Sequence, residues 1–485
     1  MLKVATHWEK ATFDPALWGD GGSVKAGISI FETLLALDED RNLIPSLAES
    51  WDVSDDRKTY TFHLRKGVRF HAGYGELTSE DVAYTLERLS DPEVGATDTK
   101  SKCKVDNIES MDTSDPYVFV LHLKEADNEI LMDFASWYTN IISKKAYEEL
   151  KPSGFGAKPV GTGPFEYESG KPAEAYIVKR FDDYWGEKAL LDKVQITMLA
   201  DESSRINLYN ACEVDIMSLN DSNNILKFGE TEGCEVKKVA GAGCYYLGMN
   251  LEKEPFTNPK VREALKYAIN YDEMLNDYWR GTLFPPTGYV QSYCIYASTA
   301  EESGFTYEYN PEKAKQLLAE AGYPNGYTID VPLSSKYPFK TKIATAIQDQ
   351  ARAAGFTLNL SEVDGAAYND MDLGGQIPLG VSNWYVDYID PDGMIYQRFA
   401  PIVTMTHSSK YQNPEFDALL NEGRQITDES KRQEIYSKAD QMITRQDYAA
   451  IPICHETKYY LMNSAVKNFE VTDMFRFHFE TAELS

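Results

Sequence analysis

Segments typical of strands and segments typical of helices alternate along the whole chain, and this alternation constrains the fold more than any other feature. Residues 60–64 (YTFHL) alternate between apolar and polar side chains and predict a half-buried strand. Residues 79–89 follow with helical spacing and acidic side chains in the first turn. Residues 311–321 form another helical pattern, which ends before Gly322. The sequence therefore predicts a mixed α/β protein.

The chain is also too long for one hydrophobic core. It has 485 residues, and chains beyond about 250–300 residues usually divide into several cores. Hydrophobic residues make up 43% of the chain, which is enough to fill cores of that size. Strand-like patterns at 458–461 and 469–471 indicate that the tail is structured. We expect two large domains, or three smaller ones, with a tail that returns to the first.

The net charge narrows the range of partners. Acidic residues outnumber basic residues by 76 to 48, which gives a net charge of −28. A field of this sign repels nucleic acid and anionic membrane surfaces, so neither is an expected partner. No run of 18 apolar residues occurs, so no membrane span is predicted. Residues 1–5 lack the pattern of a signal peptide, which leaves a cytoplasmic protein or one whose leader has been removed.

Motifs typical of catalysis and of zinc binding do not occur in the sequence. Residues 455–459 (HETKY) lack the second histidine of a zinc-protease helix, and neither a nucleophile elbow nor a phosphate-binding P-loop is found. None of the six cysteines forms a CxxC pair, and free buried thiols are the favoured interpretation. Cys234 and Cys244 could also face each other across a turn predicted at 240–243. We expect a binding protein without metal or cofactor, not an enzyme.

Two loops resemble ligand sites but fit a structural role better. The segment 161–165 (GTGPF) has the glycines of a phosphate loop, but Pro164 removes a donor amide and no lysine follows. Asp387, Asp390 and Asp392 suggest a calcium loop, but acids are missing at the first and twelfth positions that such a loop requires. We expect a structural turn in the first case and no calcium in the second.

An ordered set of motifs resembles one known family. Residues 43–89 combine a strand, a turn at Lys66-Gly67, a second strand and a capped helix. This block closely resembles the signature of the peptide-type (family 5) solute-binding proteins of bacterial ABC importers. Similar motifs stand in the expected order at 30–34 (IFETL), 159–165 (PVGTGPF), 184–186 (YWG), 258–265 (NPKVREAL), 321–324 (AGYP), 384–391 (WYVDYIDP) and 411–417 (YQNPEFD). The resemblance covers nearly the whole chain, and so many blocks in order are highly specific.

This resemblance implies an α/β, two-lobed periplasmic-binding-protein fold (class II, cluster C type) that encloses its ligand by hinge closure. It implies a first lobe at 1–40, 155–240 and 461–485, an extra subdomain of that lobe at 41–154, and a second lobe at 241–460. It also implies a small-molecule or peptide ligand, an ABC permease complex as the membrane partner, and a monomer. The protein is then expected in the periplasm or as a cell-surface lipoprotein, with its leader absent from this sequence.

Asp387 is the principal candidate for a ligand contact. In peptide-binding members of the family, the aspartate of a W-x-x-D-Y segment holds the α-ammonium group of the ligand, and Asp387 occupies that position here. A carboxylate in a closed and poorly solvated cleft pairs strongly with an ammonium group. Strand alternation would place Tyr385 on the same face as Asp387, and a loop could present Trp384 as well.

Further candidates are weaker. Glu32, next to Phe31, falls where the family places a pocket acid, although an ordinary helix-surface acid is equally consistent with the sequence. Lys336 lies near the position of a carboxylate-binding arginine in dipeptide binders, but lysine cannot form the bidentate contact, and Arg398 is a rival. Three aromatic residues could line the cleft or pack in the core: Trp8, Trp18 and Tyr245.

The sequence thus predicts a binding protein for a peptide or a related amine-bearing solute. The high aromatic content (12%) and the imperfect carboxylate contact leave open an oligosaccharide or a sugar conjugate on the same fold. A nickel chelate is a more distant alternative.

Overall fold

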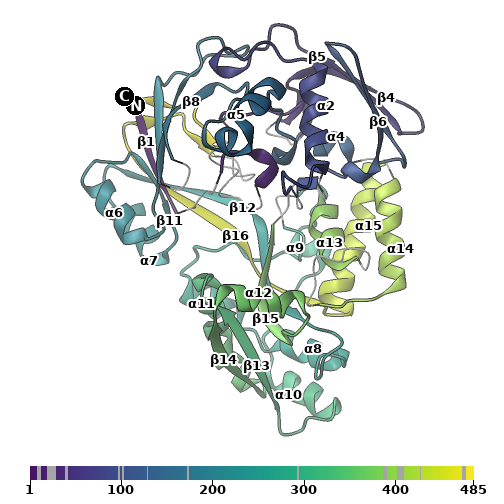
Figure 1. The fold of residues 1–485 in the computed structure, drawn as a ribbon. Helices are drawn as coiled ribbons and strands as arrows, with labels where there is room; N and C mark the ends of the chain where they lie inside the picture. The colour runs from purple at the N-terminus through teal and green to yellow at the C-terminus, as the bar shows by residue number, and fades with distance from the viewer. Residues whose placement is uncertain are drawn as a thin grey trace. The chain divides into compact units, whose positions relative to one another are not determined.

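The structure of the chain, a computed structural model (Figure 1), describes residues 1–7, 12–18, 29–38, 42–96, 99–100, 103–127, 129–171, 174–291, 294–385, 390–400, 409–426, 428–471 and 477–485. The chain divides into two compact units. Unit 1 comprises Met1–Val239 and Lys458–Ser485, and unit 2 comprises Ala240–Thr457. A separate subdomain at 41–154 stays a prediction. None of the helices in the described ranges is long and apolar enough to cross a membrane.

Unit 1 is built on two main sheets. Across the first sheet, the strands follow the order β8 (Phe165–Gly170), β9 (Ala175–Arg180), β10 (Lys193–Met198), β1 (Leu2–Thr6), β11 (Ile216–Leu219) and the last part of β16 (Ala450–Asn463). Strand β1 is parallel to both of its neighbours, and the other pairs are antiparallel. The second sheet is antiparallel, in the order β4 (Ala48–Val53), β5 (Thr59–Leu64), β7 (Val118–Leu123) and β6 (Ile108–Asp115). Since burial alternates along β5, the half-buried strand predicted at 60–64 is confirmed.

Helices and short strand pairs complete unit 1. The helices are α2 (Ser79–Glu87), α4 (Ile130–Asp133), α5 (Lys144–Ala157), α6 (Glu202–Asn210) and α7 (Ser222–Gly229). The short pairs are β2 (Leu35–Leu37) with β3 (Leu43–Pro45), β17 (Val466–Lys467) with β20 (Glu483–Leu484), and β18 (Glu470–Val471) with β19 (Phe477–His478). The predicted helix at 79–89 begins where expected, because Thr78 and Asp81 form a capping box. The tail, Lys458–Ser485, belongs to unit 1.

One half-buried lysine in unit 1 is shared by three buried acids. The Nζ atom of Lys104 lies 2.9 Å from Asp127, 3.2 Å from Glu129 and 3.2 Å from Asp133. Burial raises the pKa of Asp133 to about 7, although the charge of Lys104 acts in the opposite direction. The three acids thus share one lysine, and the carboxyl group of Asp133 is shielded from water.

This cluster predicts a pH-dependent stability. Because the folded-state pKa of Asp133 lies above its ordinary value of 3.8, its contribution to stability is fully present below pH ~4 and is lost as the pH rises through about 7. From pH 5 to 8, wild type should lose about 2 kcal/mol of unfolding free energy relative to Asp133→Asn, as measured by urea denaturation. Glu125→Gln changes an exposed acid nearby and should leave the pH profile as in wild type. Parallel profiles for wild type and Asp133→Asn would contradict the prediction.

Unit 2 combines a parallel strand pair, an antiparallel strand pair and a group of helices. Strands β13 (Tyr327–Ser334) and β14 (Phe356–Val363) are parallel, and α11 (Pro338–Ala353) connects them and packs on both (Figure 1). Strands β12 (Cys234–Met249) and β15 (Leu379–Tyr385) are antiparallel. The other helices are α8 (Pro259–Tyr267), α9 (Ala300–Ser303), α10 (Pro311–Glu320), α12 (Gly365–Leu373), α13 (Pro391–Phe399), α14 (Pro414–Gln425) and α15 (Glu429–Gln441). Helix α10 ends before Gly322, as predicted, where φ is +99°.

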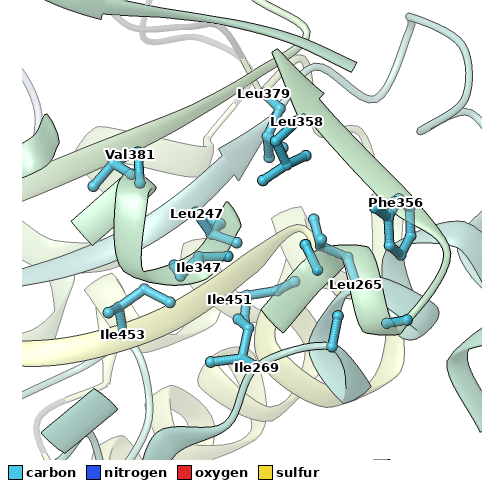
Figure 2. Packing of buried hydrophobic residues seen from close by; sticks show 14 of the residues in the cluster. Leu247, Leu265, Ile269, Ile347, Phe356, Leu358, Leu379, Val381, Ile451 and Ile453 are labelled. Atoms are coloured by element: carbon cyan, nitrogen blue, oxygen red, sulfur yellow. The ribbon is translucent and has the colours of Figure 1, made fainter. Parts of the chain in front are cut away.

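The core of unit 2 fixes the strands that carry the candidate site. Leu247 of β12, Leu265 of α8, Ile347 of α11, Phe356 of β14 and Ile451 of β16 belong to one buried cluster (Figure 2). Each is at most 3% exposed. Burial of such a side chain contributes about 1.5–3 kcal/mol, so the cluster holds these elements in one rigid arrangement.

The prediction of a turn at 240–243 is wrong. Strand β12 continues without a break from Cys234 to Met249, so Cys234 and Cys244 lie ten residues apart along one strand and cannot face each other. A Cβ atom at Gly241 would lie 2.4 Å from the carboxylate of Glu456, and one at Gly243 would lie 2.6 Å from the ring of Tyr385. The glycines therefore make room for side chains of neighbouring strands. All six cysteines are free, as expected, and four of them are buried.

Candidate functional site

The end of β15 carries two of the predicted ligand contacts. In the antiparallel pairing with β12, Trp384 is opposite Cys244 and Tyr385 is opposite Gly243. The core of unit 2 anchors this strand, because Leu379 and Val381 are buried in it (Figure 2). Asp387 lies outside the described residues, as does Trp8.

Tyr385 and Tyr245 form a hydrogen-bonded pair of phenols. Their hydroxyl oxygens are 3.4 Å apart, and Tyr385 also hydrogen bonds to the buried Glu456. Burial raises the pKa of Tyr385 well above its ordinary value, and the negative charge of Glu456 raises it further. The phenol therefore stays protonated. The ring of Tyr245 packs edge-on against Phe339 of α11, at 4.9 Å between centroids. The structure thus brings together two of the residues predicted to contact a ligand.

Trp384 and Arg398 lie together on the other side of the strand end. The indole Nε1 of Trp384 donates to the carbonyl oxygen of Gly393 at 2.9 Å. The guanidinium of Arg398, on α13, lies 5.5 Å from the Trp384 ring, and its Nε donates to the hydroxyl of Tyr246 at 2.5 Å. Arg398 is 8% exposed. Two more predicted contacts are therefore neighbours, held by β12 and α13.

The acids that begin α13 are engaged within unit 2. Asp390 caps the helix and pairs with Arg432 at 2.8 Å. Asp392 accepts a hydrogen bond from Tyr436 at 2.7 Å and lies 3.6 Å from Arg424. Both acids therefore stabilise α13 through contacts within unit 2. Among the described residues, no group of histidine, cysteine and acidic side chains could hold a metal ion.

Lys336 lies two residues before α11, and Lys340 lies in the first turn of this helix. Lys336 is exposed, and its Nζ lies 5.7 Å from the ring of Tyr337. Lys340, which the sequence did not single out, is half-buried, and its Nζ lies 4.6 Å from the same ring. Burial, and then the positive charge of Arg398, lower the pKa of Lys340 to about 8. Lys340 is therefore within the electrostatic field of Arg398.

The predicted residues of unit 1 are used in packing. The carboxylate of Glu32 accepts hydrogen bonds from three side chains, the hydroxyl of Thr162 (2.8 Å), the hydroxyl of Tyr184 (2.7 Å) and the indole of Trp185 (2.9 Å). Glu32 is thus buried and not the helix-surface acid that the sequence left open. These bonds join the motifs at 30–34, 159–165 and 184–186. A ligand contact of Glu32 stays a prediction.

Phe31 and Trp18 are also buried in unit 1. Their rings meet edge-on at 5.9 Å, and the indole of Trp18 donates to the carbonyl oxygen of Thr12 at 3.3 Å. Trp18 is also 6.5 Å from Trp137, and Phe31 is 6.2 Å from Phe155. For both residues this favours core packing, which the sequence left open for Trp18.

The segment 161–165 is the structural turn that was expected. The amide of Gly163 donates to the carbonyl oxygen of Ile30 at 2.9 Å, and the amide of Gly161 donates to Nδ1 of His71 at 3.3 Å. The Nε2 atom of His71 donates to the carbonyl oxygen of Gly163 at 2.9 Å. Burial lowers the pKa of His71 to about 4, so the ring is neutral. Both glycine amides are used inside the fold, which excludes a phosphate loop here.

Comparison with known proteins identifies the family. The model of the bacterial extracellular solute-binding proteins, family 5 Middle, matches residues 42–402. The chain belongs to this family. Heme-binding protein A of Haemophilus influenzae is 28% identical to this family 5 protein, over 94% of this chain and 87% of the relative. The dipeptide-binding protein of Escherichia coli is 27% identical, over 97% of this chain and 92% of the relative.

A solved structure supports the same assignment. The ABC transporter-associated periplasmic binding protein DppA from Helicobacter pylori, in complex with the peptide STSA, matches with a TM-score of 0.83 and 28% identity. The match covers 100% of this chain and 98% of that chain. The predicted α/β, two-lobed periplasmic-binding-protein fold is therefore confirmed for this family 5 protein. The matched relatives are binding proteins.

Proposed function

We propose that this protein binds a peptide, or a related solute with a free amino group, and delivers it to an ABC permease complex. The observation that carries the proposal is the W-x-x-D-Y segment at 384–388, in a chain that resembles peptide-binding proteins over nearly its whole length. In this proposal, Asp387 pairs with the ammonium group of the ligand. Hinge closure would then enclose the ligand.

The aromatic residues at the end of β15 support this assignment. Trp384, Tyr385 and Tyr245 combine large apolar rings with polar groups, which suits the apolar body and polar backbone of a peptide. We propose these three residues as ligand contacts. The first lobe is stabilised by the buried side chains of Glu32, Phe31 and Trp18. We propose that any contact of these residues with the ligand is secondary. The mature protein would act as a monomer outside the cytoplasmic membrane, free in the periplasm or anchored by a lipid.

Native mass spectrometry of the purified protein, followed by calorimetric titration of the ligand-free form with di- to tetrapeptides, tests the proposal. We expect a co-purified ligand with a primary amine, and saturable binding of at least one peptide group. Stabilisation by cello-, xylo- or manno-oligosaccharides, with no response to peptides, would instead favour a sugar ligand. Conversion of the bound ligand into a product would contradict a binding protein.

Gly243 offers a test of Tyr385 as a ligand contact. In Gly243→Ala, the new methyl group would lie 2.6 Å from the Tyr385 ring, so the ring must move. We expect peptide affinity to fall by about tenfold, measured by calorimetry. Gly248→Ala is the matched control on the same strand, since its methyl group would lie 3.2 Å from the hydroxyl of Ser382, which can rotate away. Equal affinities for the two variants would contradict the assignment of Tyr385.

A further inference from the structure

The end of α8 meets the beginning of α10 at one tyrosine ring in unit 2. The two helices pack against each other (Figure 1). The amide of Asn310, the residue that caps α10, donates to the carbonyl oxygen of Tyr267 at 3.0 Å. Lys266 precedes Tyr267 on α8, and Lys313 lies in the first turn of α10. This junction therefore brings two lysines to the same place.

Both ammonium groups lie against the ring of Tyr267. The Nζ atom of Lys266 is 4.4 Å from the ring centroid, and the Nζ atom of Lys313 is 3.9 Å from it. Lys266 also donates to Oγ1 of Thr306 at 2.8 Å, and Lys313 donates to the hydroxyl of Tyr267 at 2.5 Å. Contacts of this kind hold a cation in place but do not neutralise its charge. Two positive charges are thus fixed around one ring.

Lys266 is buried without a carboxylate in contact. Its side chain is 6% exposed, and no acid among the described residues forms an ion pair with either lysine. An ammonium group has three donors, and Thr306 accepts from only one of those of Lys266. A buried charge is costly unless an opposite charge accompanies it. The remaining donors of Lys266 are therefore suited to an anion.

The charges near Lys266 come from several segments. Burial lowers the pKa of Lys266 to about 8. The carboxylates of Glu308 and Glu263 raise this pKa, whereas the positive charges of Lys313 and Arg445 lower it. Lys266 is therefore mainly charged at neutral pH, and three cations stand against two acids at this place. Such a local surplus of positive charge is unusual in a chain with a net charge of −28.

The surface of unit 2 gives access to the two lysines. Thr306 is exposed and Lys313 is half-buried, so the buried ammonium group of Lys266 is bordered by residues that water reaches. Arg445, in the helical turn Met442–Gln446, is exposed as well. A small anion can thus approach from the solvent.

We propose that Lys266 and Lys313 form a binding site for an oxyanion, specifically a phosphate group. A phosphate group has enough oxygen atoms to accept from both ammonium groups and from the hydroxyl of Thr306, and its charge strengthens these hydrogen bonds. The group can belong to free phosphate or to the headgroup of an anionic phospholipid. Neither lysine is among the residues proposed to contact the peptide ligand, so the inference goes beyond the proposed function and does not depend on it.

Calorimetric titration of the purified chain with inorganic phosphate tests the site. Chloride keeps the ionic strength constant, so that a general salt effect is excluded. We expect saturable binding, with an affinity that falls about tenfold in Lys266→Gln and in Lys313→Gln. Lys313→Arg keeps the charge and should retain most of the affinity. Lys260→Gln is the matched control and should behave as wild type, because Lys260 is an exposed lysine of α8 that pairs with Glu320 at 2.8 Å.

The pH dependence of sulfate binding provides a second readout, because the charge of sulfate stays constant at neutral and basic pH. A bound anion favours the charged form of Lys266, so the affinity for sulfate should fall as the pH rises above 8. Lys313 titrates later, since its hydrogen bond to Tyr267 raises its pKa, and burial raises the pKa of the nearby Tyr448 to about 12. In Lys266→Gln the decline should disappear.

Vesicles distinguish the two sources of the phosphate group. The protein is sedimented with vesicles of phosphatidylcholine and with vesicles that also contain phosphatidylglycerol. Since the net charge of −28 opposes an anionic surface, we expect no sedimentation with either, which leaves free phosphate as the source. Sedimentation with phosphatidylglycerol that is lost in Lys313→Gln would keep the site and assign it to a lipid headgroup.

The inference is overturned if Lys313→Gln binds phosphate as tightly as wild type and wild type does not sediment with phosphatidylglycerol. Lys266 is buried, so the fold of Lys266→Gln is checked by circular dichroism, and the half-buried Lys313 keeps the test decisive. Peptide titrations report separately on the proposed function, so either proposal can fail while the other stands.

Discussion

Replacing Asp387 by asparagine should weaken the binding of peptides with a free amino terminus by roughly 30- to 1,000-fold, equivalent to about 2–4 kcal/mol. Asparagine keeps the size of the side chain and one acceptor oxygen but removes the negative charge. The ammonium group of the ligand would then be enclosed without its counter-ion, and an unpaired charge in a poorly solvated site is costly. The loss should appear mainly in the dissociation rate.

Calorimetry with a peptide and its N-acetylated form measures this effect. Wild type should reject the acetylated form by about the same factor, because acetylation removes the charge from the other side of the contact. Asp387→Asn should bind the two forms almost equally. Asp349→Asn is the matched control, since Asp349 is an exposed acid on α11 whose side chain is 82% exposed. If acetylated and free peptides bind wild type with the same affinity, Asp387 does not hold the ammonium group.

Much of the fold could be predicted because local patterns decide it. Helix α10 follows from helical spacing between an asparagine cap and Gly322, and it begins at Pro311 as predicted. The strand β5 follows from alternation of apolar and polar residues. The turn expected at 240–243 failed for the opposite reason. The glycines there leave room for the side chains of Glu456 and Tyr385. These two residues are far away in the sequence, so no local pattern can predict the contacts.

Residues of the candidate site could be predicted where they belong to a sequence motif. They could not be predicted where tertiary packing alone determines their position. The segment with Trp384 and Tyr385 could be found by resemblance, and the pairing of β12 with β15 then brings Tyr245 beside it. The partners of Glu32 are at least 130 residues away in the sequence, so its buried role could not be read from the motif alone. Lys340 could not be singled out from the sequence, because only the structure shows that it is half-buried near Arg398 while Lys336, four residues earlier, is exposed.

Replacing Arg88 by methionine should lower the free energy of unfolding by about 3–5 kcal/mol. Arg88 binds Asp14 through two hydrogen bonds, Nη1 to Oδ2 at 3.0 Å and Nη2 to Oδ1 at 2.5 Å, and its guanidinium lies 4.5 Å from the ring of Tyr147. The two side chains are 3% and 1% exposed. Without Arg88, the carboxylate of Asp14 would remain buried without an opposite charge beside it among the residues that the structure describes.

Urea denaturation of a set of variants separates the charge effect from the loss of packing. The second substitution in Arg88→Met/Asp14→Asn removes the stranded charge and keeps an acceptor for the amide of Ala16, which donates to Asp14 at 3.0 Å in the wild type. This double variant should therefore recover a large part of the stability lost in Arg88→Met. Arg352→Met breaks an exposed pair with Asp349 and should cost less than about 1 kcal/mol. If the double variant is no more stable than Arg88→Met, burial of an unpaired charge is not the cause of the loss, and the packing of Arg88 against Tyr147 would have to account for it.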